Sequence, residues 1–522
     1  MADADAIDEA DIRGALGSIG LSAALILGGT VVSQFLGLVT RIVMTRYLSV
    51  GNYGAVALGI TVLNVMGVVA LVGMEEALPR FLPRAEDDAD ERAILGAVYQ
   101  ICFALAIAIG VVGIVGANLL ATRVFDAPSL TGVVRIFGFV LPFYVAYRLG
   151  VRGVQGYGRT TPTVLVRNVV EPTSRLLAVV GLVALGLGTF GVAVGYAAGF
   201  VVAGIAGFLV LQRTAPFGLR DLLRVDVGGR RRELLTFALP LAVTGGFGLI
   251  AQQSDVVVLG VLTTSEDVGV YDVAFLAAKF LMVVTPAINY LFQPLVSEYE
   301  KEGEFGKIAK LYTITTRWIV VLAFPVFALL FLFPEVMLST VFGSAYGRGG
   351  TTLAILVLGF YVGRFSGLSG SLLAAMGKTR VIMYVSVGAE ILNIVLNVVL
   401  IALFGLVGAA VATATSRILN NFVQTVYIYR ETGLHPYRRT FVAPTALTMA
   451  TVVAVAVTLH VLRIDLGIAA ALGVTAVLGL VAVGYVLATR SVYETEVAIV
   501  RSLLENLGLP TWPATVLERF TR

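Results

Sequence analysis

The chain consists largely of long apolar runs, separated by short turns and charged stretches. Fourteen runs can be distinguished: residues 19–45, 54–78, 94–121, 132–150, 164–186, 190–211, 235–262, 269–291, 314–333, 351–375, 380–403, 405–428, 441–462 and 466–488. A helix needs about 20 apolar residues to cross the hydrocarbon core of a bilayer, and the runs are of this length. The sequence therefore predicts an all-α polytopic membrane protein with about 14 transmembrane helices.

The composition excludes several other classes of protein. Apolar residues make up 58% of the 522 residues and charged residues only 13%, whereas soluble domains carry about 25% charged residues. The net charge of +4 is too small to predict a nucleic-acid partner. One cysteine (Cys102) and two isolated histidines (His435 and His460) predict no disulfide framework, no metal site and no cofactor.

The basic residues predict the orientation of the chain in the membrane. If the N-terminus is cytoplasmic, 27 basic residues fall on the inner side and 5 at outer ends and loops, which follows the positive-inside rule. An even number of spans then leaves both termini cytoplasmic, in a multi-pass protein of the cytoplasmic membrane. The acidic segment 1–18 lacks the basic region of a cleaved signal peptide, so we expect the first run to stay in the mature protein.

Two halves of the chain share short motifs at a nearly constant offset. Gly158-Arg159-Thr160 recurs 219 residues later as Gly377-Lys378-Thr379, and Glu171 recurs at the same offset as Glu390. The loop 48–54 similarly matches 262–269. Spans one to six therefore correspond to spans seven to twelve. Because six is even, the two repeats run parallel through the membrane and should form two lobes across a central cleft.

This repeat divides the chain into six predicted parts. They are an acidic N-terminal tail (1–18), an N-lobe (19–212), a basic cytoplasmic linker (213–233), a C-lobe (234–430), two extra transmembrane helices (440–489) and a cytoplasmic tail (490–522). In the tail, Val497, Val500, Leu504 and Leu507 recur at helical spacing with Trp512 beyond them, which predicts an interfacial amphipathic helix.

Several sequence patterns only superficially resemble catalytic motifs. The GxGxxG pattern at 186–191 links two apolar helices and follows no strand, and the Gly377-Lys378-Thr379 triplet lacks the first glycine of a P-loop. The pairs Asp3/Asp5 and Asp88/Asp90 lie in acidic segments that we expect to be solvated. Gly191, Gly195 and Gly199 share one helix face and predict close helix packing. No nucleotide site is expected.

Charged residues within the apolar runs are the candidate functional residues. Each costs about 2.5–3.5 kcal/mol on insertion scales, so such residues face a cavity or pair with one another. The cations are Arg41, Arg175, Lys279, Arg364 and Arg417, and the acids are Glu171, Asp255 and Glu390. Most of the charges expected near the midplane are positive, which favours an anionic ligand.

Ion pairing offers an alternative role for most of these residues. Glu171 and Arg175 are four residues apart on one helix and could neutralise each other. Glu390 could pair with Arg364 or Arg417, and Asp255 could reach Lys279 only from a neighbouring helix. Glu75 and Glu76, which close the second span beside Arg80, are expected to form an ion pair at the interface.

Three local motifs point to a known family. They are Arg46-Tyr-Leu-Ser-Val-Gly-Asn-Tyr-Gly54, Gln155-Gly-Tyr-Gly-Arg-Thr160 and Val268-Gly-Val-Tyr271. Together with the 6+6+2 arrangement, they resemble the polysaccharide-type flippases of the multidrug/oligosaccharidyl-lipid/polysaccharide exporter superfamily, which include O-antigen flippases and archaeal relatives. The resemblance implies a V-shaped pair of lobes and a polyprenyl- or dolichyl-phosphate-linked glycan as cargo. It also implies that cavity cations bind the anionic head group, a role that by position falls on Arg41, Arg175, Lys279, Arg364 and Arg417.

The sequence thus predicts a non-enzymatic flippase that works by alternating access in polysaccharide or glycoprotein glycan export. Without a nucleotide motif, transport would use H⁺ or Na⁺ coupling or downhill flow, with Glu171, Asp255 and Glu390 as candidate coupling acids. Expected partners are membrane lipids and glycan-assembly enzymes. A drug/cation antiporter would instead have a cavity dominated by acids, and a membrane glycosyltransferase or ligase would have a large outer domain. A lipid scramblase or scaffold without specific cargo is a further alternative.

Overall fold

The structure, a computed structural model, describes residues 9–215, 218–464, 466–494 and 496–498 and, beyond them, 501, 505, 510–511, 515 and 518–521. Within these residues the fold is helical, and the only β-structure is an isolated bridge between Val492 and Thr521. Val500, Leu504, Leu507 and Trp512, on which the predicted amphipathic tail helix depends, lie outside the described residues, as do Asp3 and Asp5. The chain separates into two compact units, Met1–Gly269 and Val270–Arg522, which are described one at a time.

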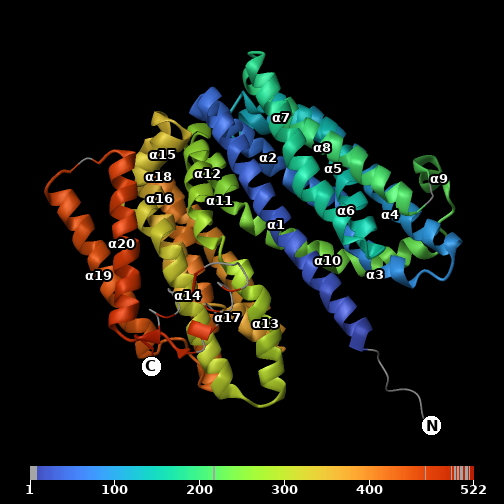
Figure 1. Ribbon diagram of the computed structural model, residues 1–522. Coiled ribbons are helices and arrows are strands. Elements are labelled where there is room, and N and C mark those ends of the chain that lie inside the picture. The colour runs from blue at the N-terminus through green and yellow to red at the C-terminus, as the bar shows by residue number, and fades with distance from the viewer. Residues whose placement is uncertain are drawn as a thin grey trace, which may run out of the picture. The chain divides into compact units, whose positions relative to one another are not determined.

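The helices of the first unit begin near the N-terminus and end at the start of α12 (Figure 1). They are α1 (Glu9–Tyr47), α2 (Val50–Leu71), α3 (Ala77–Phe81), α4 (Asp88–Leu119), α5 (Leu130–Gly156), α6 (Thr160–Leu165), α7 (Glu171–Ala184), α8 (Gly188–Thr214), α9 (Leu219–Arg224), α10 (Arg230–Gln252) and α11 (Ser254–Leu262). The central helix is α5, which packs against α8, α4 and α2, while α7 packs against α8 and α1. Aromatic side chains such as Phe137, Tyr144 and Phe200 fill the α5–α8 contact.

The helices of the second unit pack mainly around α14 and α16. They are α12 (Ser265–Lys279), whose last ten residues belong to this unit, α13 (Thr285–Lys301), α14 (Phe305–Leu332), α15 (Pro334–Phe342), α16 (Gly350–Gly363), α17 (Ser369–Ala375), α18 (Thr379–Thr432), α19 (Arg439–Val461) and α20 (Ile468–Ala488). Helix α18 is broken at Gly405, whose backbone is not helical (φ 56°, ψ −130°). Its two halves therefore correspond to the two runs predicted on either side of this glycine.

All fourteen predicted apolar runs fall on helical segments of the described chain. By length and composition, ten continuous helical segments among the described residues could cross a membrane, and the broken α18 is one of them. The protein is therefore an all-helical, multi-pass membrane protein. The exact number of crossings and the layout of the repeats stay predictions, as do the six predicted parts of the chain.

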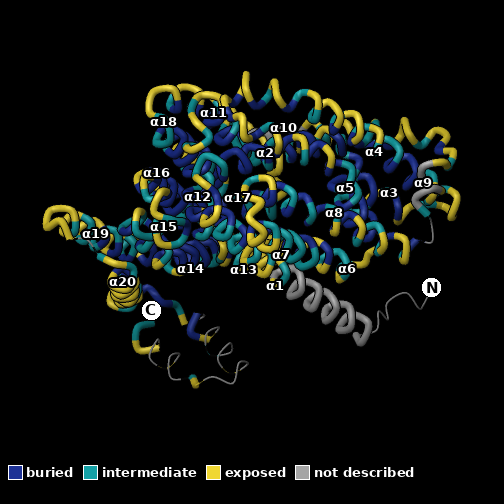
Figure 2. The backbone as a smooth tube through the Cα atoms, turned by 90° about the horizontal axis from the view of Figure 1, so that it is seen from above, coloured by how far each residue is buried: buried dark blue, intermediate teal, exposed yellow. Residues whose placement is uncertain are grey.

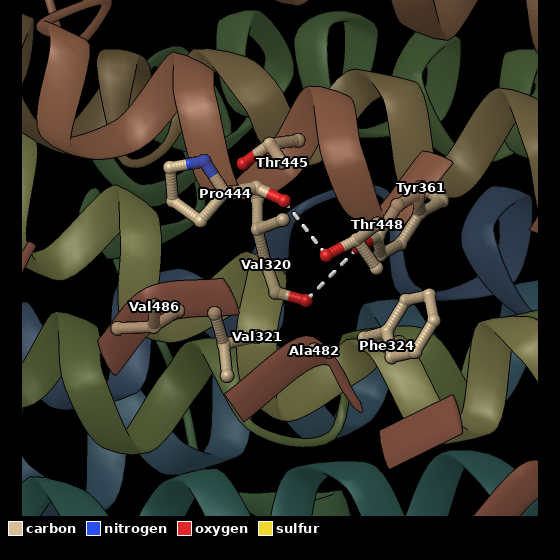
Figure 3. A pocket seen from close by; sticks show the side chains of 9 residues that line it. All are labelled: Val320, Val321, Phe324, Tyr361, Pro444, Thr445, Thr448, Ala482 and Val486. Atoms are coloured by element: carbon tan, nitrogen blue, oxygen red, sulfur yellow. Dashed lines mark hydrogen bonds between the residues drawn. The ribbon is translucent and has the colours of Figure 1, made fainter. Parts of the chain in front are cut away.

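Among the candidate membrane spans of the second unit, the last two helices are the least buried. Among the residues of their most apolar windows, only 17% in α19 and 22% in α20 are buried. Figure 2 correspondingly shows much yellow and teal along both helices. They pack against α14 around a small pocket with a mostly apolar lining, where Thr448 donates a hydrogen bond to the Pro444 carbonyl and Tyr361 donates one to that of Val320 (Figure 3). No ionisable side chain other than Tyr361 lines this pocket.

The two Gly-Arg/Lys-Thr turns have the same backbone geometry. Gly158 follows α5 with φ +71° and Gly377 follows α17 with φ +69°. Each glycine N–H donates to the carbonyl three residues earlier, and the next N–H donates to the carbonyl five residues earlier. This is the Schellman arrangement, which requires a left-handed residue and so favours glycine. The sequence repeat is therefore reproduced locally as a repeated helix stop.

The second pair of matching loops forms a reciprocal contact within the first unit. A Cβ added to Gly54 would lie 1.6 Å from the Ser265 carbonyl oxygen, and one added to Gly269 would lie 2.6 Å from the Val50 carbonyl oxygen. Gly54 corresponds to Gly269, and Val50 to Ser265, at one offset of 215 residues. Gly54 thus packs on Ser265, and its counterpart Gly269 packs on Val50, the counterpart of Ser265. Such a reciprocal contact is typical of segments related by a two-fold axis.

Two charged residues make contacts that the sequence did not predict, and for Asp90 the expectation of a solvated side chain is wrong. Asp90 is not simply solvated, because its carboxylate accepts two hydrogen bonds from Arg230, at 2.6 Å and 2.7 Å. These bonds raise the pKa of Arg230 above its ordinary value. Arg317, one of the basic residues that the sequence assigns to the inner side, is only 2% exposed. Both side chains find partners far away in the sequence, which the local charge pattern could not predict.

Candidate anion-binding site

The first unit holds one candidate cation in a close ion pair. Arg175 Nη1 donates to Glu171 Oε1 at 2.8 Å, and the two side chains are only 12% and 8% exposed. The pair lies on the first turns of α7, directly after the π-helical segment Val166–Val170. The alternative in which these two residues neutralise each other is therefore confirmed.

Two residues of α8 hold Arg175 in place. Its guanidinium lies over the Tyr196 ring, 4.8 Å from the ring centroid. Three residues further on, a Cβ added to Gly199 would lie 2.7 Å from Arg175 Cβ, so glycine allows α7 and α8 to approach closely here. This contact also confirms the packing predicted for the glycine face of α8. The Glu171 carboxylate neutralises the Arg175 charge, and the Tyr196 ring packs against its guanidinium group.

The second unit places two arginines differently. Arg364 begins the short 3₁₀ helix after α16 and donates from Nη1 to Thr285 Oγ1 at 3.2 Å. Arg417, in the second half of α18, lies over the Phe360 ring at 4.5 Å and the Phe275 ring at 5.9 Å. The two guanidinium groups are near enough to repel each other electrostatically. Among the described residues, no carboxylate pairs with either arginine.

Lys279 joins this group through the same aromatic ring. It is the last residue of α12, is exposed, and places Nζ 4.4 Å from the centroid of Phe275. Rings attract cations through their negative faces, so Phe275 and Phe360 can hold positive groups without neutralising them. We refer to Lys279, Arg364 and Arg417 as the cation cluster.

Hydrogen-bonding capacity remains unused at the arginines. The Nε atoms of Arg175, Arg364 and Arg417 are buried, and none of them has a hydrogen-bond partner in the described structure. A buried guanidinium N–H without an acceptor costs free energy unless a ligand or water supplies one. In the cation cluster, the buried Nε–H groups of Arg364 and Arg417 are therefore available to donate to an anion.

The remaining predicted site residues lie elsewhere. Arg41 is in α1 and half-buried, and Asp255 is at the start of α11, where Ser254 Oγ lies 3.5 Å from its Oδ1. Glu390 lies in the first half of α18 and is half-buried. Among the described residues, no group of three or more His, Cys, Asp or Glu side chains is arranged to hold a metal ion.

Sequence reasoning missed two sets of ion pairs. Glu75 pairs with Arg148 through bonds of 2.8 Å and 2.7 Å, and Glu76 pairs with Arg152. The predicted ion pairing of these acids is therefore confirmed, but the partners, which the sequence did not reveal, come from α5. Arg80, expected beside them, instead lies over the Phe237 ring. The i,i+4 spacing of Arg148 and Arg152 was the available signal, since it matches two adjacent acids at a helix end.

The second missed set joins the C-terminal tail to α14. Arg317 pairs with Glu496, whose other carboxylate oxygen accepts from Trp318 Nε1 at 2.5 Å. Arg317 also donates to the carbonyls of Ser491 and Thr440. This buried cluster fixes the start of the tail to the second unit.

Comparison with known families identifies the chain. Residues 20–300, more than half of its length, match the family described as Polysaccharide biosynthesis protein. The chain belongs to this family. Residues 240–399 also match the MatE family. The resemblance to polysaccharide-type members of the multidrug/oligosaccharidyl-lipid/polysaccharide exporter superfamily is thereby confirmed.

Two curated relatives come from the archaeon Haloferax volcanii. The probable low-salt glycan biosynthesis flippase Agl15 is 27% identical over 197 residues, which cover 38% of this chain and 42% of Agl15. The probable flippase AglR is 23% identical over 412 residues, covering 77% of this chain and 82% of AglR. The alignment with Agl15 thus spans less than half of that protein.

A solved structure shares the fold. The lipid II flippase MurJ in an inward closed conformation superposes with a TM-score of 0.67 at 11% identity, covering 90% of this chain and 98% of MurJ. At this identity the likeness shows the fold alone. Nearly the whole chain therefore adopts a fold known for membrane transporters.

Proposed function

We propose that this protein is a flippase that moves a polyprenyl- or dolichyl-phosphate-linked sugar or oligosaccharide across the cytoplasmic membrane. The observation that carries the proposal is the cation cluster, in which Lys279 and Arg417 share the Phe275 ring and Arg364 lies near Arg417. Neither arginine has a carboxylate partner among the described residues. The names of the relatives Agl15 and AglR support the same function. No catalytic role is proposed for any residue.

The physical task explains why such a cluster is useful. A phosphate-linked sugar must cross about 30 Å of hydrocarbon, where loss of hydration opposes an anion strongly. Guanidinium groups donate in a planar fork that matches phosphate oxygens, and an ammonium adds a mobile point charge. Arg364, Arg417 and Lys279 would replace part of the lost hydration of the head group, while the polyprenyl tail stays in lipid.

Alternating access of two lobes is the proposed mechanism. Fourteen crossings, two parallel six-helix repeats in a V-shaped arrangement and cytoplasmic termini would expose the head-group site to one side of the membrane at a time. Arg41 and Arg175 would contribute from the first repeat. The repeated turns at Gly158 and Gly377 support the repeat.

Ion coupling is a further part of the proposal. Glu171, Asp255 and Glu390 are the candidate acids, and H⁺ or Na⁺ the candidate ions. Glu171 already pairs with Arg175, so an anion that takes over Arg175 would release the carboxylate to bind a proton. Glycan-assembly enzymes and membrane lipids stay predicted partners.

A drug/cation antiporter is the second candidate, favoured by the MatE match over residues 240–399. An antiporter for cations needs exposed acids in its binding site, whereas the cation cluster would repel a cationic drug. The two candidates therefore differ in the charge of the ligand that binds.

The proposal can be tested in cells from which the gene is deleted. We expect lipid-linked glycan to accumulate on the inner leaflet and the wild-type gene to reverse this. A triple variant, Lys279→Ala, Arg364→Ala and Arg417→Ala, should not reverse it at equal expression. The matched control removes three exposed basic residues of the same unit: Lys301→Ala, Lys307→Ala and Lys378→Ala. Unchanged pools of lipid-linked glycan in the deletion strain would refute the proposal that the protein is a flippase.

A further inference from the structure

The second half of α18 carries a polar stripe, of which only Arg417 has so far been given a role. Arg417 lies four residues after Thr413, Asn420 and Asn421 lie three and four residues after Arg417, and Gln424 lies four and three residues after these two. Residues at such spacings share one face of the helix. The opposite face carries three exposed apolar side chains, Leu419, Phe422 and Val423. Polar residues within membrane helices face the protein interior or a wet cavity rather than lipid. The stripe therefore faces the inside of the second unit.

Side chains from two other segments extend the stripe. Ser386 Oγ, from the first half of α18, lies 3.4 Å from Asn420 Oδ1, and Gln424 Nε2 lies 3.4 Å from the same oxygen. Ser369 Oγ, at the start of α17, donates to Gln424 Oε1 at 3.2 Å. We refer to Ser369, Ser386, Asn420 and Gln424 as the polar ladder.

The polar ladder retains hydrogen-bonding capacity. A primary amide offers two donors and two acceptor lone pairs. The described contacts of Asn420 use only its Oδ1, so its Nδ2 group has no acceptor among the described protein atoms. The bonds that exist, at 3.4 Å, are longer than the usual 2.7–3.2 Å and so are easily exchanged for others. Asn420 and Ser386 are also only half-buried.

The position of the ladder relates it to the cation cluster. Asn420 lies three residues beyond Arg417, a rise of about 4.5 Å along the helix. In a phosphate-linked glycan, the first sugar is joined directly to the phosphate. A head group whose phosphate is held by Arg364 and Arg417 would therefore bring the hydroxyls of that sugar next to Asn420.

We propose that the polar ladder is a sugar subsite that binds the hydroxyl groups of the first sugar through Asn420, Gln424 and Ser386. This inference rests on the proposed function and adds to it the groups that recognise the sugar rather than the phosphate. Amides and hydroxyls both donate and accept, as sugar hydroxyls do, so they can select among sugars without adding charge.

The experiment measures binding to the purified full-length protein in detergent. The probes are bare polyprenyl phosphate and a set of polyprenyl-phosphate monosaccharides with neutral, N-acetylated and acidic sugars. We expect the wild-type protein to bind one of the glycosylated lipids about 10-fold more tightly than any of the other glycosylated lipids. The variant Asn420→Leu/Gln424→Leu should lose this selectivity and keep its affinity for bare polyprenyl phosphate.

A second buried amide of α18 provides the control. Asn397 is fully buried and donates to Asn393 at 3.1 Å, outside the ladder. Asn397→Leu should keep the selectivity of wild type. If the ladder variant keeps its selectivity, or loses affinity for bare polyprenyl phosphate as much as for the glycosylated lipids, the sugar subsite is refuted. If wild type binds none of the lipid phosphates, the proposed function fails instead.

Discussion

Both units hold arginines within their packed helices, but the charge is treated in opposite ways. In the first unit, Arg175 pairs with Glu171 on the same helix and lies over Tyr196. In the second unit, Arg364 contacts a hydroxyl, and Arg417 contacts two rings. A neutralised pair contributes to the fold and offers little net charge. Two arginines held by a hydroxyl and aromatic rings keep their charge, at a cost in stability that a function must justify.

The largest expected effect is the loss of transport when the unneutralised arginines are removed. Arg364→Met with Arg417→Met should lower transport about 100-fold, because truncating a desolvated charge that binds an anion typically costs 2 kcal/mol or more. The free energy of unfolding should stay equal or rise by about 1 kcal/mol, since two repelling cations are removed. Initial transport rates in proteoliposomes and thermal unfolding in detergent measure the two quantities. Loss of stability in parallel with transport would show that these arginines hold the fold.

The opposite result is expected for the neutralised pair. Glu171→Gln leaves Arg175 buried without a carboxylate and should lower the free energy of unfolding by about 3 kcal/mol. Replacing both residues by leucine should recover most of that loss, because a buried ion pair often contributes little compared with apolar side chains. Denaturant unfolding of the single and double variants measures this coupling. A double variant that is no more stable than Glu171→Gln would contradict pairing as the role of Glu171.

The buried pair of the second unit tests whether pairing, rather than the unit, decides the outcome. Arg317 and Glu496 are 2% and 6% exposed in their side chains, whereas Arg501 and Glu518 are 42% and 45% exposed. Glu496→Gln should therefore destabilise the protein by about 3 kcal/mol and expose the chain after Thr489 to protease. Glu518→Gln, the control, should change stability by less than about 1 kcal/mol. Equal effects of the two substitutions would refute the burial argument.

How much the sequence could predict differs between these groups. The apolar runs predicted the helices correctly because hydropathy is a local property of the chain. The i,i+4 spacing of Glu171 and Arg175 likewise predicted their ion pair. The ion pairs of Arg317 with Glu496 and of Arg230 with Asp90 join residues 179 and 140 positions apart. Such partners depend on how helices pack, which charge patterns along the chain do not contain. The sequence placed Arg364, Arg417 and Lys279 within spans, but it did not show that Arg417 and Lys279 share the Phe275 ring.

The smallest expected effect concerns the packing that positions Arg175. Gly199→Ala places a methyl group 2.7 Å from Arg175 Cβ and should cost about 1–3 kcal/mol through displacement of α7. Gly181→Ala, at an open position of α7, should instead stabilise the helix by about 0.5–1 kcal/mol. Thermal unfolding of both variants checks the difference. Two substitutions of the same sign would show that α7 and α8 tolerate more separation than this contact implies.

The most direct test of the central claim compares three forms of the purified protein in their affinity for a polyprenyl-phosphate-linked sugar. These are wild type, Arg364→Met/Arg417→Met, and the leucine double variant of Glu171 and Arg175. The account predicts that the first double variant binds about 100-fold more weakly than wild type, while the second loses no more than about 10-fold. Equal affinity of wild type and the Arg364/Arg417 variant would contradict the claim that the cation cluster binds the anionic head group.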